Sequence, residues 1–254
     1  MNGFWDIGDH WPPGTHSFDY GVGWVTKITV LVWIAVAVLI VFFLATYRNP
    51  KIVPTKKQWI AESIYGFARD GIAKDFMGKD GVRFAPYLAT LFSFILLTNL
   101  FGIIPFAQIS PNAHMAFPAV LAAISYVMFV YLGIRKFGFI AYFKKSLIPP
   151  GAPVWLLPLL IPLEFFSTFI MRPITLAARL WANMFAGHLI LLVFTLGGVV
   201  LLNSSSFLVK SVSVASFAMA IVMTLFEFIV QILQAYVFTL LTAFFVSEAL
   251  AEEH

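Results

Sequence analysis

The chain alternates between long apolar stretches and short polar ones, and the lengths of the apolar stretches predict membrane helices. A helix needs about 20 predominantly apolar residues to cross a hydrocarbon core of ~30 Å. Residues 24–47, 84–107 and 115–134 are each of about this length. Two later stretches, 162–202 and 210–248, are each about 40 residues long. The pattern therefore predicts three ordinary spans followed by two much longer helices.

A helix of about 40 residues is ~60 Å long, about twice the thickness of the hydrocarbon core. We therefore expect the last two helices to lie steeply tilted and antiparallel, joined by an outer turn at 203–209, with a kink at Pro173. Breaks at Pro173 and at Gly197 with Gly198 are the alternative. The predicted fold class is an all-α polytopic membrane protein with about five membrane helices and an interfacial amphipathic helix.

The basic residues predict the orientation of the chain. The loop 48–83 holds eight Lys and Arg residues and the connector 135–155 holds four, whereas 108–114 holds none. The positive-inside rule therefore assigns both basic segments and the tail 249–254 to the cytoplasm. It assigns the N-terminal arm 1–23 and the connector 108–114 to the outer side.

Apolar residues also recur at helical spacing within the first cytoplasmic loop, among charged neighbours. They are Trp59, Ile60, Ile64, Phe67 and Ala68. This pattern predicts a helix lying on the membrane surface. A solvated helix packed on a partner is an equally weighted alternative.

Composition agrees with a membrane protein and excludes several function classes. Apolar residues make up 61% of the 254 residues and charged ones 11%, and the mean hydropathy is +0.91, far outside the soluble range. We predict one membrane domain, 1–254, with a helical hairpin at 84–134 and the two long helices within 156–248. The net charge of +4 comes from short loops, so the expected partner is the lipid bilayer and not nucleic acid.

No motif for catalysis accompanies these helices. The chain has no cysteine, which excludes disulfides, thiol catalysis and thiolate metal sites. It also has no Gly-rich phosphate loop and no His/Asp/Glu cluster with metal-ligand spacing. We therefore expect no catalytic residue, metal or cofactor in this chain.

Ionisable and amide side chains inside the two long helices are the candidate functional residues. They are Glu164, Arg172, Arg179, Asn183 and His188 on the first, and Glu227, Gln231 and Gln234 on the second. A guanidinium cannot lose its proton in a protein, and an Arg at the centre of a membrane helix costs at least ~2.5–3.5 kcal/mol. Arg179, which lies far from either end of its stretch, therefore indicates a function.

Helical geometry predicts which of these residues meet. Asn183 lies one turn from Arg179 on the same face, and the three polar residues of the second helix share one face at i, i+4 and i+7. Because the helices are antiparallel, His188 and Glu227 should lie together on the outer side of Arg179, with Gln234 near its depth. Histidine titrates near neutral pH and a buried Glu can exchange protons in that range, as a proton path requires.

At these residues the chain closely resembles subunit a of the F-type ATP synthases, the stator of the membrane sector. The resemblance rests on RLWANMFAGHLI (Arg179 to Ile190), on FEFIVQILQAYVFTLLTAFF (Phe226 to Phe245) and, more weakly, on TNLFGIIP (Thr98 to Pro105). It covers most of the chain from Tyr87 onward. It implies a proton-conducting subunit of a bacterial plasma membrane that faces a ring of c subunits and contacts b-type stalk subunits.

The same resemblance implies residue roles. Arg179 would be the essential arginine facing the ring, Gln234 its neighbour, and His188 with Glu227 the lining of the outer half-channel. Some members carry the carboxylate on the earlier helix and the histidine on the later one, so we interpret the arrangement here as the same pair inverted. Glu164 resembles an acidic residue near the cytoplasmic half-channel. Any ATP chemistry would belong to partner subunits.

Several side chains have plainer explanations. Arg172 could line the cytoplasmic half-channel or extend toward lipid headgroups. Three residues of the connector, Gln108, Asn112 and His114, could line an outer vestibule, although an ordinary exposed loop is the preferred interpretation.

Amides such as Asn183, Gln231 and Gln234 commonly bridge membrane helices without conducting anything, and His188 with Glu227 could form a hydrogen bond that carries no protons. An ion-coupled secondary transporter and a non-conducting assembly scaffold are the alternative functions. A transporter would usually show paired internal repeats, which the sequence lacks.

Overall fold

The computed structural model describes residues 21–22, 25–48, 50–104, 109–148, 154–203 and 207–251. Within them the only strands are β1 (Gly21–Val22) and β2 (Val25–Thr26), which form a minimal antiparallel hairpin. The rest of the regular structure is helical, which confirms the all-α fold class. The predicted arm 1–23, apart from residues 21–22, and the tail residues 252–254 lie outside the described residues.

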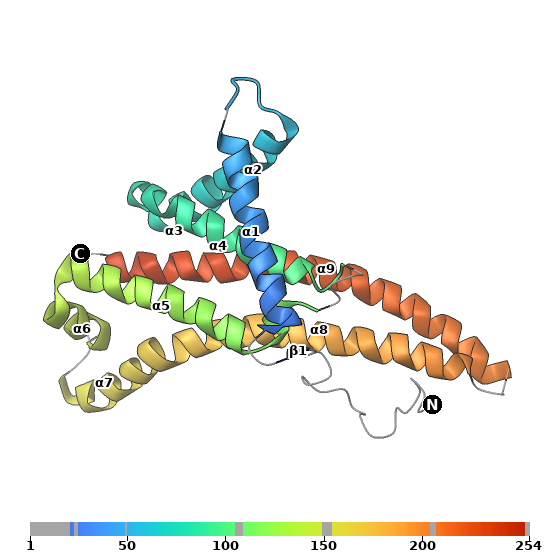
Figure 1. The fold of residues 1–254 in the computed structure, drawn as a ribbon. Helices are drawn as coiled ribbons and strands as arrows, with labels where there is room; N and C mark the ends of the chain where they lie inside the picture. The colour runs from blue at the N-terminus through green and yellow to red at the C-terminus, as the bar shows by residue number, and fades with distance from the viewer. Residues whose placement is uncertain are drawn as a thin grey trace.

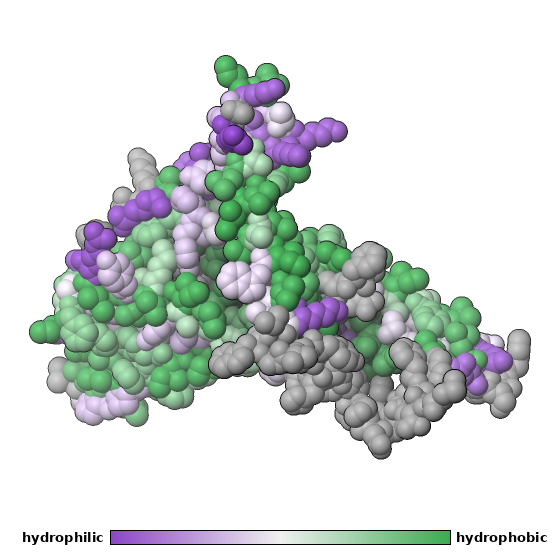
Figure 2. All heavy atoms as spheres, in the orientation of Figure 1, coloured by the Kyte–Doolittle hydropathy of each residue, from purple (hydrophilic) through white to green (hydrophobic). Residues whose placement is uncertain are grey.

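Five helices of the described chain are long and apolar enough to cross a membrane, as predicted. The first is α1 (Lys27–Tyr47), whose N-terminus is capped by the Thr26 hydroxyl accepting from the Thr29 N–H. Its 21 residues span about 31 Å, which matches the hydrocarbon core. Hydrophobic side chains cover α1 along most of its length, and hydrophilic ones gather near the end that leads to α2 (Figure 2).

The basic loop 48–83 forms several short helices in succession: α2 (Lys56–Gly66), η2 (Phe67–Lys74), α3 (Asp75–Met77) and η3 (Lys79–Phe84). Small and aliphatic residues of η2, among them Ala68 and Ile72, are buried in a cluster with α4 and α9. Trp59, Ile60 and Phe67 of the predicted apolar face are exposed instead. The loop helices therefore pack on the chain through one face and leave three large apolar side chains at least partly exposed.

A hairpin follows, made of α4 (Ala85–Leu100) and α5 (Ala116–Phe137) with the short η4 (Pro111–Ala113) between them. The helix α4 ends seven residues earlier than the apolar stretch 84–107 predicts. The connector 135–155 contains a helix that the sequence analysis missed, α6 (Phe139–Leu147). This helix begins at Gly138, whose φ of 85° is a left-handed conformation that glycine adopts without strain.

The first long span begins with η5 (Val154–Leu156) and continues through α7 (Leu157–Phe165), η6 (Phe166–Met171) and α8 (Arg172–Leu202). The π-helical η6 lies immediately before Pro173, at the position of the predicted kink. Proline lacks the N–H that would continue the α-helical pattern, so the irregularity before it has a direct cause. The helix α8 continues without interruption through Gly197 and Gly198, so the alternative break there does not occur.

The last helix, α9 (Phe207–Leu250), is 44 residues long and lies antiparallel to α8. Figure 1 shows α8 and α9 running side by side across the molecule, with α1 crossing their direction steeply. Since α1 has the length of an upright span, the two long helices must be steeply inclined in the same bilayer.

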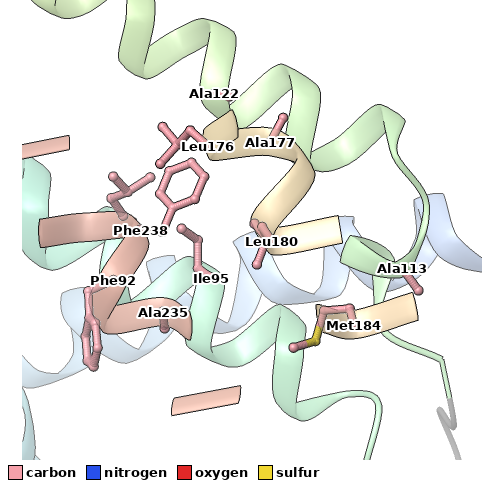
Figure 3. Close-up of a cluster of buried hydrophobic side chains, with 11 residues drawn as sticks. Phe92, Ile95, Ala113, Ala122, Leu176, Ala177, Leu180, Met184, Ala235 and Phe238 are labelled. Carbon is pink, nitrogen blue, oxygen red and sulfur yellow. The ribbon is translucent and has the colours of Figure 1, made fainter. Parts of the chain in front are cut away.

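The largest core cluster holds α8 against its neighbours. Leu176, Leu180 and Met184 follow one another at intervals of four residues on α8 and are 0–3% exposed. Figure 3 shows Leu176 and Leu180 directed toward Phe238 of α9 and Ile95 of α4. This packing fixes the rotation of α8 about its axis, and with it the face on which the remaining side chains lie.

Candidate functional site

His188 and Glu227 form a buried pair between α8 and α9. The His188 Nδ1 lies 2.8 Å from Glu227 Oε1, and the two side chains are 6% and 4% exposed. The Nε2 of the same ring accepts a hydrogen bond of 3.0 Å from the backbone N–H of Ser110. The two residues that the antiparallel arrangement matched for depth are therefore in direct contact, and a third partner comes from the outer connector.

Two glycines leave room for this pair. A Cβ on Gly102, in the turn after α4, would lie 2.4 Å from His188 Cε1. A Cβ on Gly187 would lie 3.0 Å from Glu227 Oε1. Carbon atoms normally approach to about 3.5–4.0 Å, so any larger residue at Gly102 would displace the imidazole.

The outer connector is not an exposed loop, contrary to the preferred interpretation. Ser110 and Asn112 are 0% and 1% exposed. The Asn112 side-chain amide donates to Thr98 Oγ1 at 2.8 Å and to Asn99 Oδ1 at 2.7 Å. Polar connector residues are buried here because α4 supplies hydrogen-bond partners for them. His114 is partly exposed next to this buried turn, and Gln108 lies outside the described residues.

The amides of the two long helices also meet. Asn183 Nδ2 donates to Gln234 Oε1 at 2.7 Å, and Gln231 Nε2 lies 3.4 Å from Glu227 Oε1. Three buried polar atoms on one face of α9 have no partner among the described residues: Glu227 Oε2, Gln231 Oε1 and Gln234 Nε2. Such atoms usually bind water, so this face offers a row of hydrogen-bonding positions beside the His188 pair.

Arg179 lies near the middle of the span Leu157–Leu202 and is exposed on the surface of the chain. It forms no hydrogen bond or ion pair with any residue that the structure describes. Its neighbours on the same face, Thr175 and Asn183, are exposed as well. A permanent charge is thus presented outward, near the middle of the span, on a face that none of the described residues covers.

Hollows lie on both sides of Arg179 along α8. On the side of the outer connector, Asn183, Gly187 and Glu227 line a pocket of about 190 Å³. On the other side, Arg179 itself, Ser167 and Arg172 line a pocket of about 230 Å³. Arg179 therefore lines one of two separate pockets and lies one helical turn from Asn183, which lines the other.

A third pocket, of about 250 Å³, lies near the C-terminal end of α9 and is lined by both Glu164 and Arg172. Arg172 forms a bidentate ion pair with Glu248 at the end of α9, with N···O distances of 2.7 and 2.8 Å. Arg172 lines this pocket and also the one beside Arg179. The side chain is thus engaged within the protein, and the sequence analysis did not identify Glu248 as its partner.

Other residues around the pair were also missed. Ser110, Gly102 and Asn99 contribute to the surroundings of His188 and Glu227, yet none carries a charge. Asn99 gives the clearest signal that the sequence could have provided, because an amide inside an apolar helix needs a partner. It donates to the Gln231 backbone carbonyl at 3.2 Å.

Comparison with known proteins gives consistent matches. The family model described as ATP synthase A chain matches residues 29–247. The chain is 42% identical to ATP synthase subunit a of Nocardioides sp., over 96% of this chain and 94% of that protein. It is 45% identical to ATP synthase subunit a of Frankia alni, over 94% of this chain and 84% of that protein. It is 40% identical to ATP synthase subunit a of Pseudarthrobacter chlorophenolicus, over 98% of this chain and 97% of that protein.

Proposed function

The chain belongs to the ATP synthase A chain family, as a subunit a of the membrane sector, and from this premise we propose that it conducts protons to and from a rotating ring of c subunits. A multi-pass membrane protein of a bacterial ATP synthase complex needs such a path to couple proton flow to rotation. In this proposal the chain carries no catalytic site of its own, and ATP chemistry belongs to other subunits.

The observation that carries the proposal is Arg179, a charge that is exposed in the middle of an apolar span and has no partner among the described residues. Leaving it in hydrocarbon would cost at least ~2.5–3.5 kcal/mol, so an anionic partner must approach this face. A carboxylate on a passing helix of the ring would meet that requirement. At an effective dielectric of ~20, opposite charges 4 Å apart attract by roughly 4 kcal/mol, which favours the ionised carboxylate.

The two hollows support separate half-channels. A proton from outside would reach Glu227 through the pocket lined by Asn183 and Gly187, and would then neutralise a carboxylate of the ring. After rotation, the proton would leave by the pockets that contain Arg172 and Glu164. Arg179 keeps the two paths apart, because a guanidinium repels protons and cannot itself carry one.

The orientation follows the positive-inside rule. The loop 48–83 and the segment 135–155 lie in the cytoplasm with the C-terminus, and the N-terminus lies outside. The exposed apolar side chains of α1, such as Trp33 and Val41, are available to lipid or to a membrane helix of a b-type stalk subunit.

The test uses ATP-driven proton pumping by the assembled complex in membrane vesicles. Arg179→Ala should assemble but lower pumping at least about 100-fold, given an attraction of roughly 4 kcal/mol. The matched control, Arg135→Ala, removes an exposed Arg at the end of α5 and should pump normally. Full pumping by Arg179→Ala would eliminate the proposed role.

The outer half-channel has its own test. Glu227→Gln should slow proton uptake from the outer side far more than His114→Ala does, because only Glu227 lines the pocket beside Asn183. Equal and negligible effects of both substitutions would refute this half-channel.

A further inference from the structure

The two nitrogens of His188 have different partners, and one of these partners determines where the ring proton lies. The backbone N–H of Ser110 donates to Nε2 at 3.0 Å. A peptide N–H can only donate, so Nε2 must present its lone pair. In the neutral ring the proton is then on Nδ1, which donates to Glu227 Oε1 at 2.8 Å.

Ser110 is held firmly in this position. Its hydroxyl donates to the Thr98 carbonyl at 3.0 Å and accepts from the Asn112 N–H at 3.2 Å. The Asn112 side chain is bound to Asn99, which in turn donates to the Gln231 carbonyl on α9. This network connects the connector to the helix that carries Glu227, so Ser110 cannot withdraw from His188 without breaking several buried hydrogen bonds.

The contact with Ser110 leaves no place for a proton on Nε2. A proton arriving at Nε2 would meet the N–H of Ser110, which already points at that atom. Gly102 lies so close to the ring that a single added carbon would be 2.4 Å from Cε1, so the imidazole has little room to turn. His188 also does not line the pocket beside Asn183, whereas Glu227 does.

Glu227, in contrast, uses only one of its two carboxylate oxygens in the contact with His188. Its Oε1 accepts from His188, while Oε2 is buried and has no partner among the described residues. A proton can bind to Oε2 and leave from it again while the bond between Oε1 and His188 stays intact. No proton on His188 needs to move during this exchange.

We propose that Ser110 locks His188 in the neutral form protonated on Nδ1, and that Glu227 Oε2 is the atom that takes up and releases protons in the outer half-channel. His188 is then a positioning residue and not a proton carrier. This inference rests on the proposed function and assigns roles within its outer path.

The first test compares two variants of the assembled complex for ATP-driven proton pumping. His188→Asn cannot carry a proton, but its amide can still donate to Glu227 from near the Nδ1 position, so pumping should fall by about tenfold or less, the scale of one weakened hydrogen bond. Glu227→Gln should lower pumping by about 100-fold or more, because no oxygen remains that can be protonated. The amount of assembled complex is measured for both.

The second test reads the proton position directly and needs no substitution at the site. Nitrogen-15 NMR of the complex with labelled histidine, assigned with a variant that lacks His188, should show a protonated Nδ1 and an unprotonated Nε2 at neutral pH. A ring protonated on Nε2, or on both nitrogens, would overturn the proposal.

The results of these tests distinguish a failure of the role assigned to His188 from a failure of the proposed half-channel. If His188→Asn assembles and loses pumping as completely as Glu227→Gln, the positioning role of His188 is wrong and the half-channel stands. If Glu227→Gln pumps normally, the outer half-channel itself is wrong. If His188→Asn does not assemble, the NMR measurement decides the tautomer alone.

Discussion

Replacing Gly102 with alanine should slow the outer proton path by moving His188 away from Glu227. The added Cβ would lie 2.4 Å from His188 Cε1, 3.0 Å from its Nε2 and 3.2 Å from the Asn99 carbonyl oxygen. Gly102 does not have a positive φ, so alanine fits the backbone conformation. The whole effect must therefore come from the steric contact with the ring and its surroundings.

The magnitude follows from the distances. To restore a normal carbon–carbon contact of about 3.5–4.0 Å, the ring must move by more than ~1 Å. Hydrogen bonds of 2.8 and 3.0 Å on its two nitrogens would then exceed the limit for a bond. Losing both costs ~1–3 kcal/mol and overpacking a similar amount. Because His188 positions Glu227 and carries no proton in this account, the expected effect on the rate is that of the lost hydrogen bond, about tenfold.

The assay is ATP-driven acidification of membrane vesicles, normalised to the amount of assembled complex. Gly102→Ala should reduce pumping by about tenfold, the scale of the lost hydrogen bond between His188 and Glu227. Gly197→Ala is the matched control, since its Cβ would meet only Ser216 Oγ at 4.0 Å. That substitution should leave pumping unchanged and stabilise α8 by up to ~1 kcal/mol. Wild-type pumping by Gly102→Ala would refute the requirement for a fixed His188.

Four further substitutions test the surrounding interactions. Asn99→Ala should lower the stability of the complex by ~1–3 kcal/mol in thermal unfolding, because it leaves buried amide and carbonyl groups unpaired; unchanged stability would contradict the buried network. Glu248→Gln should lower the stability of the complex, measured in the same way, by less than ~1 kcal/mol, since the ion pair between Glu248 and Arg172 is part-exposed. Asn183→Ala and Gln234→Ala should be non-additive in pumping, because their side chains share a 2.7 Å bond; additive losses would show that this bond carries no coupling.

Most of the fold could be predicted because membrane helices are determined by length and apolarity. The spans around α1, α5 and the two long helices follow directly from the stretches of the sequence. The short α6 could not be found in this way, since its nine residues are too few to span a bilayer. The helix follows the basic pair Arg135 and Lys136 and contains the second pair, Lys144 and Lys145, in a segment where a polar connector was expected.

Some contacts of the site could likewise be predicted from the sequence, and others could not. The contact between His188 and Glu227 could be predicted because two antiparallel helices joined by a short turn match residues by depth. The contribution of Ser110 could not, since it uses a backbone N–H that every residue except proline has. The role of Gly102 could not be predicted either, because this glycine leaves space for the imidazole ring of His188, which lies on a distant helix.

Cysteine cross-linking tests most directly whether the face of Arg179 meets the rotor. The chain has no native cysteine, so Thr175→Cys, one helical turn from Arg179 on the same exposed face, is a clean probe. Paired with a cysteine beside the ring carboxylate, it should form a disulfide with a c subunit under mild oxidation, whereas Leu44→Cys on α1 should not. If Thr175→Cys gave no cross-link to any c subunit in an actively pumping complex, Arg179 would not face the ring, and the proposed coupling through it would be wrong.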